Sequence, residues 1–236
     1  MSERKQNKKI DNKAPVIVGV GDFTDRSKED GLNPQELLAK ASKLAIKDSG
    51  IKDLNKQIDY VGVVRFSVDF LTATNQSSFQ YSNFPRTLSN KLGIQATNEI
   101  YAPMGGNSPQ VLLEDALIKI SSGETDCALL AGGEALQTMI ARLKAGMSLD
   151  WLDEPGGNPE MIGNNAIGFS EHEKIHGMDL PTNVYPLFAQ SLRKKDNKTA
   201  EQHLKECSSL FSEFSKVASN NPYSWFPTFR SEEEIA

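Results

Sequence analysis

The chain has 236 residues, of which 38% are hydrophobic and 24% charged, and its formal net charge is −5. This composition is typical of a folded domain with a core, and the acidic balance argues against a nucleic-acid partner, which would need Lys and Arg to displace counterions. No stretch is apolar enough for a signal peptide or a membrane span, so we expect a cytoplasmic protein.

Strand and helix patterns alternate along the first part of the chain. A polar tail at 1–13 is expected to be disordered. In chain order we expect a strand at 14–23, a helix at 33–50, a strand at 58–66, a polar loop at 67–80, a helix at 84–93, a strand at 98–102, a helix at 107–123, a strand at 126–134 and a helix at 135–146. This alternation predicts an α/β fold with a parallel-rich sheet and helices on both faces.

Two of these helices carry clear apolar stripes. The helix at 33–50 is expected to bury Leu37, Ala41, Leu44 and Ala45, and the helix at 84–93 to bury Phe84, Leu88 and Leu92.

The composition changes near Gly146. Residues 147–177 are rich in Gly, Pro and polar side chains and are expected to hold no strand, and helices should follow at 182–195 and 199–220. The second helix has a stripe expected to be buried, formed by Leu204, Cys207, Phe211, Phe214 and Ala218. We therefore divide the chain into an α/β domain at 14–146 and a mainly helical domain at 147–236.

Two short motifs favour ordinary structural interpretations. Gly19-x-Gly21-x-x-Thr24 lacks the third glycine of a dinucleotide fingerprint, and the next helix begins too late to meet a pyrophosphate. His172-Glu173-x-x-His176 has zinc-hydrolase spacing, but the nearby His203 lies in a separate predicted helix and Glu201 is only a guess for a third ligand. Because Gly177 ends any helix at once, a surface turn capped by Ser170 and Glu173 is favoured, and no metal is expected.

Neither cysteine is expected to be a nucleophile. Cys127 lies in an apolar strand pattern and Cys207 lies on a helix stripe, and neither has an evident base or helix N-terminus that would lower its pKa. The 80 residues between them also argue against a disulfide framework or a zinc ribbon.

The turn "YAPMGGNSPQ" has two interpretations. Gly105, Gly106, Asn107 and Ser108 join a strand to a helix, and backbone N–H groups at such a junction can bind an oxyanion or carbonyl oxygen. The alternative is a helix cap in which the glycines give backbone freedom.

The sequence resembles the thiolase superfamily, in particular acetyl-CoA acetyltransferases and thiolase-like proteins akin to the sterol-carrier-protein thiolases. The resemblance covers about residues 14–230 and includes "PVIVGVGDFTDR", "IDYVGVVRF" and "HGMDLPTNVYPLFAQSLR". Its most specific part is "GGNSPQVLLEDALIKISSGETDCALLAGGEA", where Ile120, Gly123, Asp126, Leu129, Gly132, Gly133 and Glu134 form the pattern IxxGxxDxxLxxGGE.

The resemblance implies the N-terminal half of a thiolase-like fold plus its loop domain, without the C-terminal half. It places the nucleophilic cysteine of true thiolases at Gly106, with Ser108 as a weak candidate to replace it. It also makes His172, His176 and Met178 candidates for a pocket in the loop domain. It also implies acyl-CoA as substrate or ligand, no other cofactor, a homodimer, and a separate protein as a possible source of the missing half.

These features lead to two hypotheses beside the zinc hydrolase. The first is a thiolase-like acyl-CoA acyltransferase of lipid metabolism that lacks the usual cysteine, on a truncated chain that alone does not cleave 3-ketoacyl-CoA. The second is a non-catalytic acyl-CoA- or lipid-binding module or a partner subunit.

Overall fold

The computed structural model describes residues 14–67, 81–163 and 168–236. The tail at 1–13 and almost all of the expected loop at 67–80 lie outside these ranges. The chain forms two compact units, Met1–Asn165 and Ala166–Ala236. Residues 147–163, which we expected to begin the helical domain, belong to the first unit.

The first unit is built on a four-stranded sheet. Its strands are β1 (Tyr60–Val64), β2 (Asn98–Ala102), β3 (Ala128–Ala131) and β4 (Glu160–Met161), in the order β3-β1-β2-β4. All three pairings are parallel, which confirms the expected α/β class. Because the strands are parallel, their carboxyl ends meet at one edge of the sheet.

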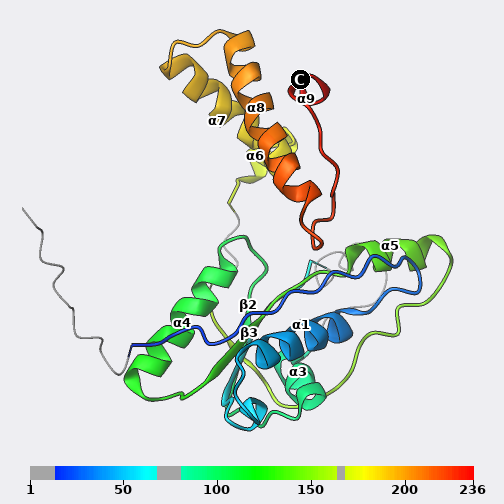
Figure 1. Ribbon diagram of the computed structural model, residues 1–236, viewed down its shortest axis with the longest axis vertical. Coiled ribbons are helices and arrows are strands. Elements are labelled where there is room, and N and C mark those ends of the chain that lie inside the picture. Colours follow the sequence, from blue (N-terminus) through cyan, green and yellow to red (C-terminus); the bar gives the residue numbers. More distant parts are fainter. Residues whose placement is uncertain (1–13, 68–80, 164–167) are drawn as a thin grey trace, which may run out of the picture. The chain divides into compact units, whose positions relative to one another are not determined.

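Helices cover both faces of this sheet (Figure 1). α1 (Pro34–Asp48) and α3 (Phe84–Leu92) contribute to the hydrophobic cluster on one face, and α4 (Ser108–Ser122) contributes to the cluster on the other. The first unit also contains a 3-10 turn, η1 (Leu54–Lys56), and the helix α5 (Leu136–Lys144). The expected helices at 33–50, 84–93, 107–123 and 135–146 are therefore confirmed.

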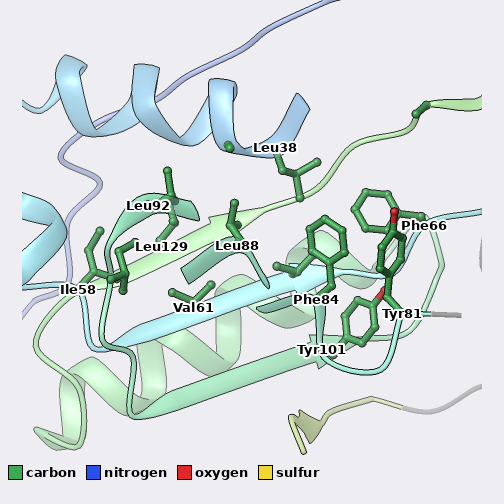
Figure 2. Close-up of a cluster of buried hydrophobic side chains, with 14 of the residues drawn as sticks. Leu38, Ile58, Val61, Phe66, Tyr81, Phe84, Leu88, Leu92, Tyr101 and Leu129 are labelled. Carbon is green, nitrogen blue, oxygen red and sulfur yellow. The ribbon is translucent and has the colours of Figure 1, made fainter. Parts of the chain in front are cut away.

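The larger cluster contains the expected stripe of α3 (Figure 2). Phe84 and Leu88 are fully buried, and Leu92 is 8% exposed. The ring of Phe84 lies edge-on against Phe66 and Tyr81, with centroids 4.6 and 4.7 Å away. This aromatic group closes the core near the carboxyl end of β1.

The predicted stripe of α1 was wrong by about one residue. The helix buries Leu38, Ala39 and Ser42, whereas Leu44 is 41% exposed. Asn33 caps the helix in a capping box with Glu36, as expected. Of the predicted stripe, Leu37 packs against the core cluster, whereas Ala41, Leu44 and Ala45 lie next to Gly19 or Gly21.

The predicted strand at 14–23 was also wrong, because none of these residues is assigned to a strand (Figure 1). The segment lies on α1, where an added Cβ on Gly19 would be 2.3 Å from the Ala45 carbonyl oxygen and one on Gly21 would be 2.2 Å from that of Ala41. Val16 and Ile17 are each 74% exposed. The segment contacts a helix at its glycines rather than pairing with a sheet edge.

The expectation of no strand in 147–177 was wrong as well. β4 pairs with β2, with Glu160 opposite Ile100. A buried polar group secures the chain that leads to it: Asn83 donates to a carboxylate oxygen of Glu99 at 2.9 Å and to the Gly156 carbonyl at 3.1 Å. Arg86 forms an ion pair with the same Glu99. This tertiary anchoring cannot be read from local sequence patterns.

The second unit is mainly helical, as expected. It contains α6 (Glu171–Ile175), α7 (Pro181–Lys195), α8 (Ala200–Ser219) and α9 (Glu232–Ile235). No described helix of either unit is long and apolar enough to cross a membrane.

The predicted burial of the α8 stripe was wrong. Phe211 and Phe214 are 55% and 57% exposed, whereas Ser208 and Ser212 are buried. The Ser212 hydroxyl donates to the carbonyl oxygen of Arg230 at 2.8 Å. The C-terminal segment therefore covers the serine side of α8.

Candidate functional site

The turn between β2 and α4 lies at the carboxyl edge of the sheet. β2 ends at Ala102 and α4 begins at Ser108, so five residues connect them. Gly106 and Asn107 are exposed, and Ser108 is 2% exposed. In open α/β sheets, ligands bind at this edge. In α4 the N–H groups of Ser108 and Gln110 already donate to the carbonyl oxygens of Gly105 and Asn107.

Two side-chain oxygens gather over Gly105. A Cβ on Gly105 would be 3.1 Å from Oδ1 of Asn107 and 3.2 Å from Oγ of Ser108. Asn107 is the N-cap residue of α4, yet its side chain makes no capping hydrogen bond. The turn thus combines polar side-chain oxygens with the exposed N-terminus of a 15-residue helix.

The glycines of this turn are not required for left-handed backbone. The glycines with positive φ in the described chain do not include Gly105 or Gly106. A Cβ on Gly106 would have no atom within 4 Å. The position that resemblance assigned to the nucleophile is therefore open enough to hold a side chain.

The turn has no cysteine, and its hydroxyl lacks an evident base. The Ser108 hydroxyl has no hydrogen-bond partner within the described ranges. All three histidines fall in the sequence of the second unit, so the first supplies no imidazole. A serine without a base is a weak nucleophile.

A carboxylate that sequence reasoning did not single out as a site residue lies at the same edge. Glu134 follows β3 and accepts hydrogen bonds from the backbone N–H and the hydroxyl of Ser67, which follows β1. Its second oxygen, Oε2, is buried and has no hydrogen-bond partner among the described residues. The Gly132-Gly133-Glu134 motif contained the signal for Glu134, but only the pairing of β1 with β3 brings Ser67 to it.

The motif at His172–His176 forms the expected capped turn. Ser170 and Glu173 form a capping box, with the Ser170 N–H donating to the Glu173 carboxylate at 2.7 Å. This bond from the Ser170 backbone holds the pKa of Glu173 below its usual value. The rings of His172 and His176 are 4.9 Å apart and exposed, and Met178 is half-buried. Within the described ranges, no three His, Cys, Asp or Glu side chains are grouped to hold a metal ion.

Both cysteines are free and partly buried. Burial, followed by the nearby carboxylates of Asp59 and Asp126, raises the pKa of the Cys127 thiol. The Cys207 sulfur lies 3.7 Å from Nε2 of His203, one helical turn away. The environment of Cys127 agrees with the expectation of an unreactive thiol.

The glycines of the failed dinucleotide motif line a cavity instead. This cavity, of about 980 Å³, lies among the segment at 14–21, α1, α4 and β3. It does not include the turn at 105–108, and α1 begins only at Pro34, so no helix N-terminus lies at Gly19 or Gly21.

These features define an α/β protein with a parallel sheet, helices on both faces and an open strand–turn–helix junction at the carboxyl edge. Comparison with family models gives no match, and no curated protein matches the chain. Among solved structures, the chain matches a monomeric SCP2-thiolase-like protein type 1 from Mycobacterium smegmatis, with a TM-score of 0.67 and 28% sequence identity. The match covers 96% of this chain and 40% of that one.

The match identifies the fold as part of a thiolase-superfamily fold, which confirms the resemblance drawn from the sequence. The chain spans less than half the length of the matched protein.

Proposed function

We propose that this chain is a thiolase-like relative of the acyl-CoA acyltransferases that binds acyl-CoA, or a related thioester, at the turn 105–108. The observation that carries the proposal is the exposed turn at the carboxyl edge of the sheet, where the amide side chain of Asn107 and the hydroxyl of Ser108 lie over Gly105. The likeness to an SCP2-thiolase-like protein supports the ligand class that the sequence resemblance implies. Because Gly106 replaces the cysteine, the chain alone binds the thioester without forming an acyl-enzyme.

Calorimetry with acetyl-CoA and a long-chain acyl-CoA tests the binding. We expect saturable binding of at least one of them and no cleavage of 3-ketoacyl-CoA by the unmodified chain. Binding without turnover also fits the non-catalytic module, whereas measurable cleavage would show that a cysteine at the turn is not needed. If neither thioester binds, the proposal is wrong.

A cysteine introduced at Gly106 tests whether the turn receives the acyl group. In a Cys127→Ala, Cys207→Ala background, we compare Gly106→Cys with Ser122→Cys at the opposite end of α4. The helix dipole favours a thiolate at the N-terminus, so iodoacetamide should modify Gly106→Cys about 3- to 30-fold faster. With acetyl-CoA, the new thiol should take the acetyl group as CoA leaves, and mass spectrometry detects the thioester. Equal rates in both variants would contradict the proposal.

The homodimer and the loop-domain pocket of His172, His176 and Met178 remain predictions. The matched protein is described as monomeric. Sedimentation velocity therefore tests the dimer, and His176→Ala, measured by the same calorimetry, tests the pocket.

A further inference from the structure

A segment at 149–163, here called the strap, passes from the hydrophobic cluster on one face of the sheet to the cluster on the other. Its Trp151 is 4% exposed within the larger cluster, and the Trp151 carbonyl accepts from the side-chain amide of Gln35 at 2.6 Å. Its Asp153 carboxylate accepts from the hydroxyl of buried Thr87 at 2.7 Å. The first half of the strap is therefore anchored in the core.

The second half of the strap is fixed to the sheet edge and to α4. It contains β4, which pairs with β2 and places Met161 opposite Tyr101. Glu160 forms an ion pair with Lys119 of α4 at 2.8 Å, and the Lys119 side chain is only 14% exposed. Ile162 packs against the cluster on the α4 face. These contacts hold the last residues of the strap beside the helix that follows the turn.

The strap ends at Gly163, which contacts the chain on both sides of the turn 105–108. A Cβ added to Gly163 would be 3.2 Å from Cγ and Cδ of Pro103 and 4.0 Å from Cγ1 of Val111. Pro103 is buried and leads from β2 into the turn, and Val111 lies in the first helical turn of α4, where its N–H donates to the Asn107 carbonyl. The φ of Gly163 is 75°, so its conformation and this close approach both favour glycine.

We propose that the strap is a positioning element of the turn 105–108 and acts through Gly163. Because Gly163 contacts the chain before and after the turn, it fixes the separation of the two ends. Between them the Ser108 N–H donates to the Gly105 carbonyl at 3.1 Å and closes the turn. The consequence for thioester affinity rests on the proposed function, whereas the consequence for the turn itself does not.

Hydrogen exchange, measured by NMR on the full chain, tests the effect on the turn. Gly163→Ala presses a methyl group against Pro103. Gly146→Ala is the matched control, because Gly146 also has a positive φ, of 70°, and a Cβ there would meet no atom within 4 Å. Both variants carry backbone strain, and only Gly163→Ala also displaces the turn. We expect the Ser108 amide to exchange about tenfold faster in Gly163→Ala than in Gly146→Ala. The amide of Gly123, at the other end of α4, should exchange alike in both.

A second pair of variants loosens the strap away from the turn. Glu160→Ala removes the ion pair with Lys119, and Glu154→Ala, at an exposed residue of the same strap, is its control. Glu160→Ala should speed exchange at Ser108 about threefold, and Glu154→Ala should not change it.

Circular dichroism and thermal melts confirm that each variant is folded, and Glu160→Ala keeps the test decisive if Gly163→Ala does not fold. Exchange at Ser108 that matches the control, in Glu160→Ala or in a folded Gly163→Ala, would overturn the proposal.

Calorimetry with the acyl-CoA that the wild type binds tests the effect on the ligand. Gly163→Ala should bind it about fivefold more weakly than Gly146→Ala, because the turn no longer presents its groups in one arrangement. Equal affinities in the two variants would overturn the positioning role. If the wild type binds no thioester, the proposed function fails, and exchange at Ser108 alone decides whether the strap positions the turn.

Discussion

Ser67 donates both its backbone N–H and its hydroxyl to the same carboxylate oxygen of Glu134, at 2.8 and 2.6 Å. Ser67 follows β1 and Glu134 follows β3, so the pair ties two neighbouring strands together at the edge that carries the turn 105–108. The second oxygen of Glu134, Oε2, is also at this edge, where it is buried and has no hydrogen-bond partner among the described residues.

Glu134→Gln should destabilise the protein. One oxygen can still accept from Ser67, but the new NH₂ group would occupy the buried site of Oε2, and we expect a loss of about 1–3 kcal/mol in the free energy of unfolding. Urea denaturation measures the change. Gln137→Ala, at an exposed residue of α5, is the control. A Glu134→Gln variant as stable as the wild type would show that the pair is not structural.

Phe84→Ala should be among the most destabilising single changes. Phe84 is fully buried between Phe66 and Tyr81, so the substitution leaves a cavity and should cost about 3–5 kcal/mol. Leu143→Ala, at a residue 56% exposed, should change stability little. Equal losses in the two variants, measured by urea unfolding, would argue against the core described for the first unit.

Asp25 should make the stability of the first unit depend on pH. Its carboxylate accepts from the N–H groups of Leu32, at 2.8 Å, and Ser27, at 2.9 Å. The Leu32 bond, followed by the Ser27 bond, holds the pKa of Asp25 below its usual value of 3.8. The pKa of Asp25 is lower in the folded chain than in the unfolded chain. The ionised carboxylate therefore stabilises the folded state above the unfolded pKa, and this stabilisation is lost as pH falls through the folded pKa.

Thermal melts of the wild type and of Asp25→Asn, from neutral pH down to below the pKa of Asp25, measure the stability that the Asp25 carboxylate provides. The wild type should be the more stable at neutral pH, and the difference should shrink as pH falls below about 4. A difference that stays constant at every pH would show that the carboxylate charge is not involved.

Zinc should not bind stoichiometrically. Glu173 is engaged with Ser170 as a helix cap, and no third ligand groups with His172 and His176 among the described residues. Metal analysis of the purified chain, with zinc titration by calorimetry, should show no tight site. The zinc interpretation would be restored by one zinc per chain that is lost in both His172→Ala and His176→Ala.

The sequence alone determined the helices and the central strands. Two of these signals are local. The spacing of Phe84, Leu88 and Leu92 follows the turns of one helix, and the capping box joins Asn33 to Glu36, three residues away. The pattern IxxGxxDxxLxxGGE also carried the family resemblance. Gly123, for example, ends α4 with a φ of 80°.

Tertiary structure alone decided which extended segments became strands. "APVIVGVGDF" has a strand's composition, yet it lies against α1, whereas Glu160–Met161 pairs with β2 despite its polar surroundings. It also decided that Glu134 meets Ser67 and that the stripe of α8 is exposed. The physical reason is that a strand needs an adjacent backbone edge and a stripe needs a covering surface, and both come from residues distant in sequence.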